Sequence, residues 1–374
     1  MKKLASMLLL LPLTFGGSLL AQNRSVSFED TTLAVSLAKA KAANKLIFFD
    51  GYATWCGPCK YMSNTVFKQD KVADFFNANF VNVKFDMEKG EGIELAKKYA
   101  VKAYPTFLIL DAEGNLVHRI VGGAEADEFI EKVKVGMNPT TSLAGQQASY
   151  QNGNREPDFV KSYLKTLQDA YMEDNAQDVA TAYLRSLKEK DRITKENWPI
   201  YNDFINDASS KEFLFILTNR IKFTDAIGDS AVDAKISSVF TEKAMSFLVN
   251  RKGSVYSKEE ALKLRNLISA SKPANIQKFN LILDMADAKF AKNGSALAGL
   301  VTTSMKNANL SDQESYSILS QIVPLVADSA PKNDKLLVSA YIDTVIASLK
   351  EPKAKPYFEK MKGKLSGTTE ETKK

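Results

Sequence analysis

The chain has 374 residues, a formal net charge of +6, 45% hydrophobic residues and 25% charged residues. This length exceeds what one hydrophobic core usually supports, so we expect at least two domains. The charge is small for this size, and no basic block is interleaved with aromatic residues, which argues against nucleic acid as a ligand. One histidine, His118, and two cysteines are too few for a transition-metal site, so we expect no metal and no bound cofactor.

The first 21 residues have the pattern of a secretory signal peptide. Lys2 and Lys3 supply the positive start, Leu4–Leu13 supply the apolar stretch, and cleavage is expected after Ala21. The apolar stretch is short for a hydrocarbon core of about 30 Å, which disfavours the alternative of an uncleaved anchor. Export of this kind from a bacterium would place the mature protein in the periplasm, where disulfides form and persist.

Residues 22–137 are expected to form one domain in which helices and strands alternate. Apolar runs rich in aromatic residues indicate strands, and alanine- and lysine-rich stretches with helical spacing indicate helices. Helices are predicted over 31–44, 56–67, 70–79, 92–99 and 125–136, and strands over 46–50, 80–86, 106–110 and 117–121. This order predicts an α/β domain with a mixed central sheet and helices on both faces.

The stretch Asp50–Lys60, DGYATWCGPCK, contains both cysteines of the chain, Cys56 and Cys59. Pro58 suits the first turn of a helix, which places Cys56 at the helix N-terminus. There, free backbone N–H groups and the helix dipole favour the thiolate, which is the nucleophilic form. Cys59 lies one turn further on the same face and is expected to be more buried. The spacing predicts a dithiol in which Cys56 attacks and Cys59 resolves the mixed disulfide.

The motif WCGPCK resembles the active site of the thioredoxin family, and the resemblance covers Val26–Met137. It implies a thioredoxin fold and a redox-active Cys56–Cys59 disulfide. It also implies that Asp50 is the buried carboxylate that accepts the proton of Cys59. Within KYAVKAYPTFLIL, Pro105 matches the family's cis-proline. The implied substrate groove is made by Trp55, Gly57, Pro58, Tyr104, Pro105 and Gly122.

Three features depart from the family pattern. Tyr104 stands before the cis-proline, where the family usually has a small or aliphatic residue, so its ring is expected to reshape the groove. The lysine that often pairs with the buried carboxylate is replaced by Asn82, and Lys84 on the same strand face is the candidate substitute. Lys89–Ile93 is a short insertion that contains two glycines.

Residues 138–361 are expected to form a second domain that contains only helices. Amphipathic stretches alternate with glycine and proline breaks, and helix pairs recur at a spacing typical of α-solenoids of the TPR kind, although no TPR consensus is in register. Helices are predicted over 158–171, 176–189, 197–207, 210–223, 230–250, 258–270, 274–292, 296–308, 312–328 and 332–349. Residues 362–374 are polar and are expected to be disordered.

These features predict a periplasmic thiol–disulfide oxidoreductase that acts on protein disulfides. The Gly-Pro spacer between the cysteines resembles that of reducing thioredoxins, which favours reduction or interchange, with electrons from a membrane protein of the DsbD type. The helical domain is expected to dock a client or a redox partner, since solenoids usually bind protein, with oligomerisation as the other possibility. The alternative is a partner-binding or chaperone-like helical scaffold whose thioredoxin module only recognises partners.

Overall fold

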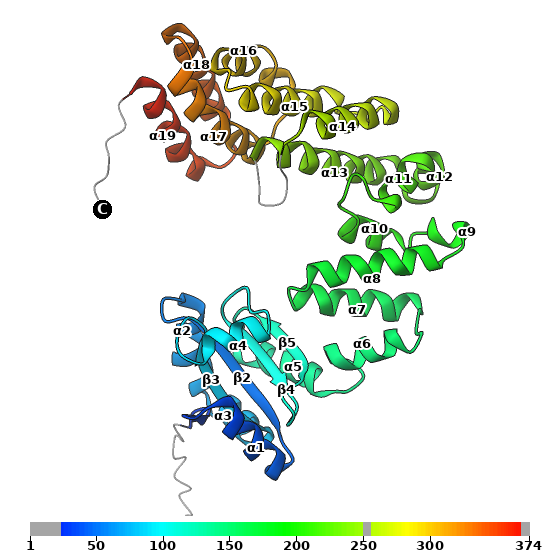
Figure 1. Ribbon diagram of the computed structural model, residues 1–374, viewed down its shortest axis with the longest axis vertical. Coiled ribbons are helices and arrows are strands. Elements are labelled where there is room, and N and C mark those ends of the chain that lie inside the picture. The colour runs from blue at the N-terminus through cyan, green and yellow to red at the C-terminus, as the bar shows by residue number, and fades with distance from the viewer. Residues whose placement is uncertain (1–23, 250–255, 368–374) are drawn as a thin grey trace, which may run out of the picture. The chain divides into compact units, whose positions relative to one another are not determined.

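The computed structural model describes residues 24–249 and 256–367, so the predicted signal peptide and residues 368–374 lie outside the described residues (Figure 1). The chain forms two compact units, of which the first ends at Ala176 and the second begins at Gln177. The first unit contains the sheet, and the described residues of the second contain helices and no strand. Within the described ranges, no helix combines the length and the apolar character needed to cross a bilayer.

The first unit is built on a five-stranded mixed sheet with the strand order β1-β3-β2-β4-β5. The strands are β1 Phe28–Glu29, β2 Leu46–Tyr52, β3 Phe80–Asp86, β4 Thr106–Leu110 and β5 Leu116–Val121. β3 runs parallel to β1 and β2, whereas β4 runs antiparallel to β2 and β5. The predicted mixed sheet is confirmed. Sequence analysis missed β1, because two residues are too short to show an alternating pattern.

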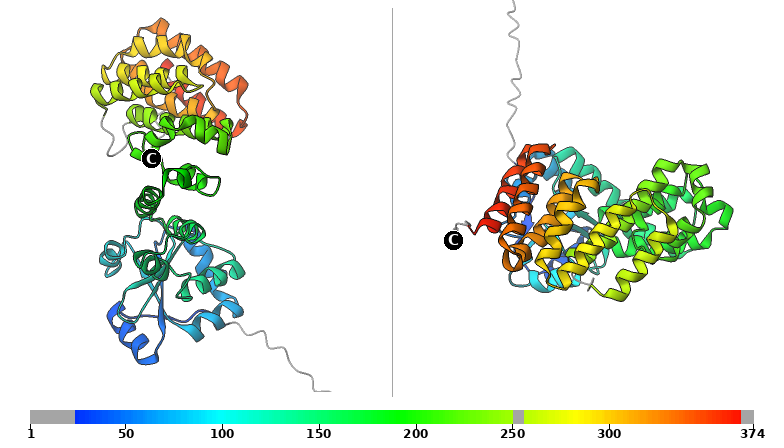
Figure 2. Two further views of the ribbon diagram at one scale, coloured as in Figure 1. Left: turned by 90° about the vertical axis from the view of Figure 1, so that its right-hand side faces the viewer. Right: turned by 90° about the horizontal axis from the view of Figure 1, so that it is seen from above.

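Helices cover both faces of this sheet (Figure 1 and Figure 2). They are α1 Leu33–Ala43, α2 Gly57–Asn64, η1 Val66–Lys68, α3 Asp70–Asn79, α4 Gly92–Lys98 and α5 Ala126–Met137. Phe48 of β2 points to the face covered by α2, α3 and α5, where its ring packs edge-on against Phe76 at a centroid distance of 4.5 Å. Phe49, the next residue, points to the opposite face with Leu95 of α4. This alternation places Asp50, two residues after Phe48, on the α2 side of the sheet.

Two further helices, α6 Leu143–Gln151 and α7 Pro157–Asp169, belong to the first unit. The N–H of Leu143 donates to Nδ1 of the buried His118 at 3.1 Å. The guanidinium of Arg119 donates to the carbonyl oxygens of Tyr99 and Ala170. The division of the chain therefore lies later than the predicted boundary after Met137. Sequence analysis missed α6 because its sequence, LAGQQASYQ, has almost no apolar stripe.

The described residues from α8 onward confirm the prediction of an all-helical region, whereas a TPR-like repeat stays a prediction. The helices are α8 Glu173–Ser186, which spans the division, α9 Glu189–Arg192, α10 Trp198–Phe204, α11 Lys211–Thr218, α12 Arg220–Ile227, α13 Asp229–Val249, α14 Lys258–Ser271, α15 Ile276–Phe290, α16 Gly294–Thr303, η2 Met305–Asn307, α17 Asp312–Ser329, α18 Lys332–Ser348, η3 Pro352–Ala354 and α19 Lys355–Ser366. The predicted helix 210–223 is broken at Asn219, which separates α11 from α12.

The predicted disordered tail from Lys362 is wrong for its first residues, because α19 continues through Ser366. Phe358, Met361 and Leu365 form the buried stripe of this helix, so the polar residues between them lie on its outer face. The rest of that segment, residues 368–374, lies outside the described residues.

Candidate active site

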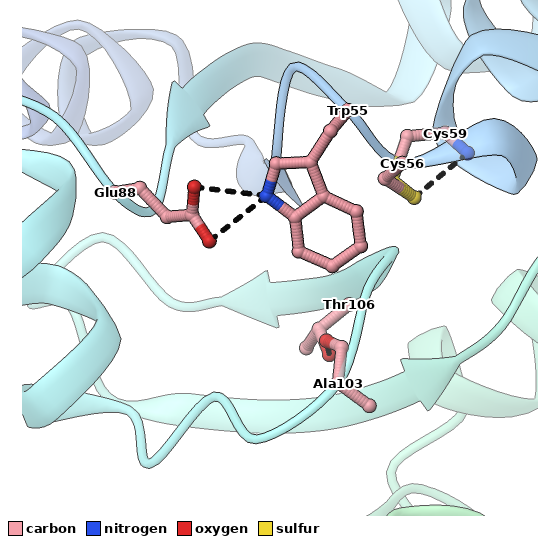
Figure 3. The surroundings of a disulfide bond; sticks show 6 residues. All are labelled: Trp55, Cys56, Cys59, Glu88, Ala103 and Thr106. Carbon is pink, nitrogen blue, oxygen red and sulfur yellow. Dashed lines mark hydrogen bonds between the residues drawn. A yellow bond between two sulfur atoms is a disulfide. The ribbon is translucent and has the colours of Figure 1, made fainter. Parts of the chain in front are cut away.

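Cys56 and Cys59 form a disulfide, with 2.08 Å between the sulfur atoms and 5.3 Å between the Cα atoms (Figure 3). Cys56 is the N-cap of α2, and Pro58 lies in the first turn, as predicted. The Sγ of Cys56 accepts a hydrogen bond from the N–H of Cys59 at 3.1 Å. A sulfur in this position receives backbone donors and the positive end of the helix dipole, both of which stabilise a thiolate.

The two cysteines are buried to the same extent, in contrast to the expectation that Cys59 would be more buried. Cys56 is 3% exposed and Cys59 is 4% exposed. They pack with Ala53, and the rings of Tyr52 and Tyr104 lie against this group. Burial therefore does not distinguish the attacking from the resolving sulfur in the disulfide form, and the N-cap position of Cys56 is the feature that does.

Asp50 lies in the centre of β2 and is 3% exposed. Burial raises the pKa of its carboxyl group from 3.8 to about 7, because the charged form loses hydration, and the positive charge of Lys84 opposes this shift. Lys84 is the residue opposite Asp50 in the parallel pair of β2 and β3, so both side chains start from the same face of the sheet. No hydrogen-bond partner lies near Oδ1 of Asp50 within the described part of the chain.

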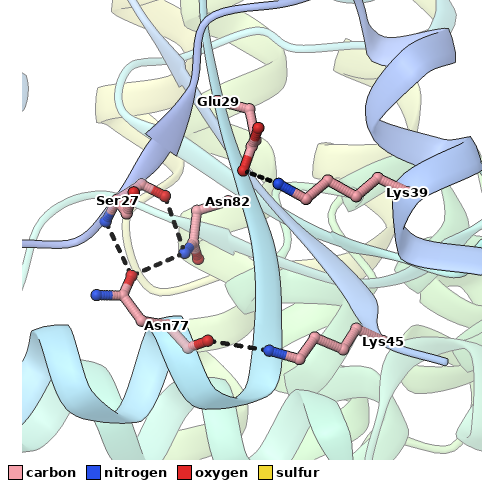
Figure 4. A network of polar contacts seen from close by, with 6 residues as sticks. All are labelled: Ser27, Glu29, Lys39, Lys45, Asn77 and Asn82. Atoms are coloured by element: carbon pink, nitrogen blue, oxygen red, sulfur yellow. Dashed lines mark hydrogen bonds and ion pairs between the residues drawn. The ribbon is translucent and has the colours of Figure 1, made fainter. Parts of the chain in front are cut away.

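Asn82, which stands where the family often has a lysine, is engaged elsewhere (Figure 4). Its Nδ2 donates to the carbonyl oxygen of Ser27 at 3.3 Å and to Oδ1 of Asn77 at 3.2 Å. These bonds join the segment before β1 to α3. Lys84 is thus the cation that acts on Asp50, as the sequence predicted for a substitute lysine.

The groove residues Tyr104 and Pro105, just before β4, and Gly122, just after β5, come together around a cis peptide bond between Tyr104 and Pro105. The N–H of Gly122 donates to the carbonyl oxygen of Pro105 at 2.9 Å, which fixes the end of β5 beside the proline. Gly122 has φ +89°, a conformation that side chains with a Cβ rarely adopt. Gly57, between the two cysteines, is exposed at the start of α2.

Trp55 lies exposed beside the disulfide, and its indole is held by Glu88. Sequence analysis did not identify Glu88 as a site residue. The Nε1–H of Trp55 donates to both carboxylate oxygens of Glu88, at 3.0 and 3.1 Å (Figure 3). The indole ring stands edge-on to Tyr104 with 5.9 Å between the ring centroids, although 66% of Trp55 is exposed. Burial raises the pKa of Tyr104, and the negative charges of Glu88 and Asp86 add to this effect.

Glu88 lies in the turn between β3 and α4, next to the inserted stretch with two glycines. The acidic residue just before that insertion was the available signal. Gly92 allows the turn to close tightly, because a Cβ there would lie 2.0 Å from the carbonyl oxygen of Asp86. In the ranges that the structure describes, no group of three or more His, Cys, Asp or Glu residues is placed to hold a metal ion.

The matches to known proteins described below each cover a third of this chain or less. The family model described as "Thioredoxin-like domain" matches residues 33–135. Thioredoxin-1 of Drosophila melanogaster is 41% identical over 87 residues, which are 23% of this chain and 73% of that protein. A peptide-N(4)-(N-acetyl-beta-glucosaminyl)asparagine amidase of Caenorhabditis elegans is 31% identical over 123 residues, and the match spans 33% of this chain but only 18% of that protein.

Among solved structures, a Bacteroides thetaiotaomicron protein described as a candidate disulphide-isomerase is 49% identical to this chain. The match covers 32% of this chain and 98% of that protein, with a TM-score of 0.30.

Proposed function

The chain belongs to the thioredoxin family through its first unit, and from this we propose that it is a thiol–disulfide oxidoreductase that acts on protein disulfides. The observation that carries the proposal is the Cys56–Cys59 disulfide at the N-terminus of α2, together with a buried carboxylate on the preceding strand β2 whose pKa is raised to about 7. These two cysteines are the only ones in the sequence, so neither has a third cysteine of the sequence to pair with.

In the reductive direction, the reaction starts from the dithiol form. The thiolate of Cys56 attacks one sulfur of a client disulfide, the client S–S bond breaks, and the second client sulfur leaves as a thiolate. The thiolate of Cys59 then attacks the Cys56 sulfur, which forms the Cys56–Cys59 disulfide and releases the first client sulfur. Two electrons pass to the client, whose two sulfurs take up protons.

Asp50 is the proposed acceptor for the proton that Cys59 loses before its attack. An ordinary aspartic acid would be fully ionised at neutral pH and would hold a proton poorly. A carboxyl group with a pKa of about 7 both accepts and returns a proton at neutral pH. The positive charge of Lys84 limits the shift, and this keeps part of the Asp50 population ionised and ready to accept.

We place this activity in the periplasm, with client proteins that carry disulfides and a membrane electron donor of the DsbD type. The signal-peptide pattern of residues 1–21 supports the location, and the Gly-Pro spacer supports the reducing or interchange direction. The helical second unit would dock a client or a redox partner, because extended helical arrays usually bind protein.

The test is reduction of insulin disulfides by the protein in the presence of dithiothreitol, followed by trapping with Cys59→Ala. We expect turnover by the parent protein, none by Cys56→Ser, and a stable mixed disulfide at Cys56 in Cys59→Ala. If Cys56→Ser retains full biological activity, the second candidate, a helical scaffold that binds partners without redox chemistry, replaces the enzyme.

A further inference from the structure

Strand β5 is one of the two edges of the sheet and pairs only with β4, whereas β1 forms the other edge. In an antiparallel pair, alternate residues exchange hydrogen bonds with the neighbouring strand, and the residues between them point away. Because Gly122 bonds to Pro105, the next residue of β5 that faces β4 is Ile120. The backbone N–H and C=O groups of Arg119 and Val121 therefore point to the free side, where another strand could pair with them.

A groove with a volume of about 500 Å³ lies along this edge. We call it the edge groove. Its floor is His118–Val121, one wall is Glu128 and Lys132 of α5, and the other wall is Thr166 and Gln168 of α7. Helix α7 thus forms the second wall of the groove beside β5. All of these residues belong to the first unit.

Among the charged groups of the edge groove, Arg119 is the one cation for which the described part of the chain supplies no carboxylate partner. Lys132 pairs with Glu128 at 2.7 Å, and Lys165 pairs with Asp169 at 2.8 Å, so these four residues neutralise one another. Arg119 is 7% exposed and donates to two backbone carbonyl groups. Its Nε has no hydrogen-bond partner among the described residues. The groove therefore carries a buried positive charge that an acidic side chain would balance.

The edge groove is continuous with the site of the disulfide. Its floor ends at Val121, and the next residue, Gly122, bonds to the carbonyl oxygen of the cis-proline Pro105. A chain that runs along β5 would therefore arrive at the groove beside Cys56 in an extended conformation. Main-chain hydrogen bonds to a strand edge bind many sequences, which suits an enzyme that acts on more than one client.

We propose that the edge groove holds an extended, acidic segment of the client polypeptide, added to the sheet beside β5 while the client's cysteine reacts at Cys56. This rests on the proposed function. It gives α7 a role in client binding, because α7 forms the outer wall, and it assigns Arg119 and Val121 as the backbone partners of the client.

The test is backbone hydrogen exchange of Arg119 and Val121 in the Cys59→Ala protein joined to a peptide. The probe is an extended peptide of about twelve residues, long enough at about 3.3 Å per residue to follow β5. It carries one activated cysteine near one end and aspartates along its length. The matched control is a short peptide with only that cysteine and its two neighbours. We expect exchange at both amides to slow at least about tenfold with the long peptide and to stay unchanged with the short one.

A second measurement uses two exposed residues of α7. Gln168→Trp fills the edge groove from its wall, whereas Asp158→Trp adds the same ring in the first turn of the helix, outside the groove. With the long peptide as a disulfide substrate, Gln168→Trp should raise KM about tenfold at unchanged kcat. Asp158→Trp should behave like the parent protein, and the short peptide should not distinguish the two variants.

The outcomes separate this inference from the proposed function. Unchanged exchange at Arg119 and Val121 in a mixed disulfide that does form overturns the inference and leaves the enzyme in place. Equal protection by both peptides also overturns it, because local closure would then explain the effect. Protection that rises with protein concentration without peptide would identify a second copy of the chain as the occupant and overturn it too. If neither peptide forms a mixed disulfide with Cys56, the proposed function is refuted and this inference falls with it.

Discussion

Replacing Asp50 by asparagine should stabilise the first unit at high pH but not at low pH. A carboxyl group whose pKa is raised on folding stays protonated in the folded protein when the unfolded chain has already lost the proton. Its contribution to stability is therefore present below the unfolded pKa of 3.8 and is lost as the pH rises towards the folded pKa of about 7. At about 1.4 kcal/mol per pH unit, the interval corresponds to about 4 kcal/mol.

Asparagine cannot ionise, so Asp50→Asn removes this pH-dependent loss. A constant cost of about 1–3 kcal/mol for an incompletely hydrogen-bonded buried amide adds to the difference at every pH. The informative quantity is thus the change in the free energy of unfolding, variant minus parent, between pH 4 and pH 8. We expect it to rise by about 4 kcal/mol, in favour of the variant at pH 8.

The measurement is urea unfolding of the disulfide form, followed by Trp55 fluorescence in a Trp198→Phe background. These are the only two tryptophans in the sequence, and Trp198 lies in the second unit, so the signal then reports the first unit. Asp30→Asn, at an exposed position, controls for the loss of one negative charge. A difference between Asp50→Asn and the parent that stays constant within about 1 kcal/mol from pH 4 to pH 8 would refute the assignment of Asp50 as a buried, proton-holding group.

Three further predictions use single substitutions. Lys84→Met should raise the pKa of Asp50 above about 7, because it removes the opposing positive charge; carboxyl titration by NMR in the disulfide form measures this, and an unchanged or lower pKa contradicts it. Burial lowers the pKa of His118 to about 4, so its neutral form contributes stability above its ordinary pKa of 6.5. About 3 kcal/mol of this stability should be lost as the pH falls from 6.5 to 4. If the free energy of unfolding of His118→Gln falls with pH by the same amount as that of the parent protein, the prediction is wrong. Glu88→Ala should free the indole of Trp55 and raise KM for insulin severalfold with a smaller change in kcat, seen together with altered Trp55 fluorescence; Glu88→Gln, which keeps an acceptor, should recover most of the loss.

The thioredoxin fold of the first unit and the residues around the disulfide could be predicted because local sequence determines them. The strand Leu46–Tyr52, the N-cap position of Cys56 and the cis peptide bond at Pro105 each depend on a few adjacent residues with strong preferences. Lys84 was predictable as the cation near Asp50, because residues two apart on a strand share a face.

What could not be predicted depends on contacts between distant parts of the chain. Glu88 accepts a hydrogen bond from Trp55, which lies 33 positions away in the sequence, and no local pattern predicts that bond. The burial of Cys56 follows from the rings of Tyr52, at the end of β2, and Tyr104, in the segment before β4, which pack against the disulfide. Helix α6 has little amphipathic character of its own, and it is held by Leu143 against His118.

The two carbonyl groups that Arg119 binds belong to Tyr99 and Ala170, which cap the ends of α4 and α7. One side chain thus fastens an element of the sheet domain to a helix that lies beyond the family match, which ends at residue 135. A protein trimmed after Met137 would leave this guanidinium with half of its acceptors and His118 without its donor. Anyone who produces this domain alone, or grafts it onto another protein, should therefore retain the chain as far as Ala176.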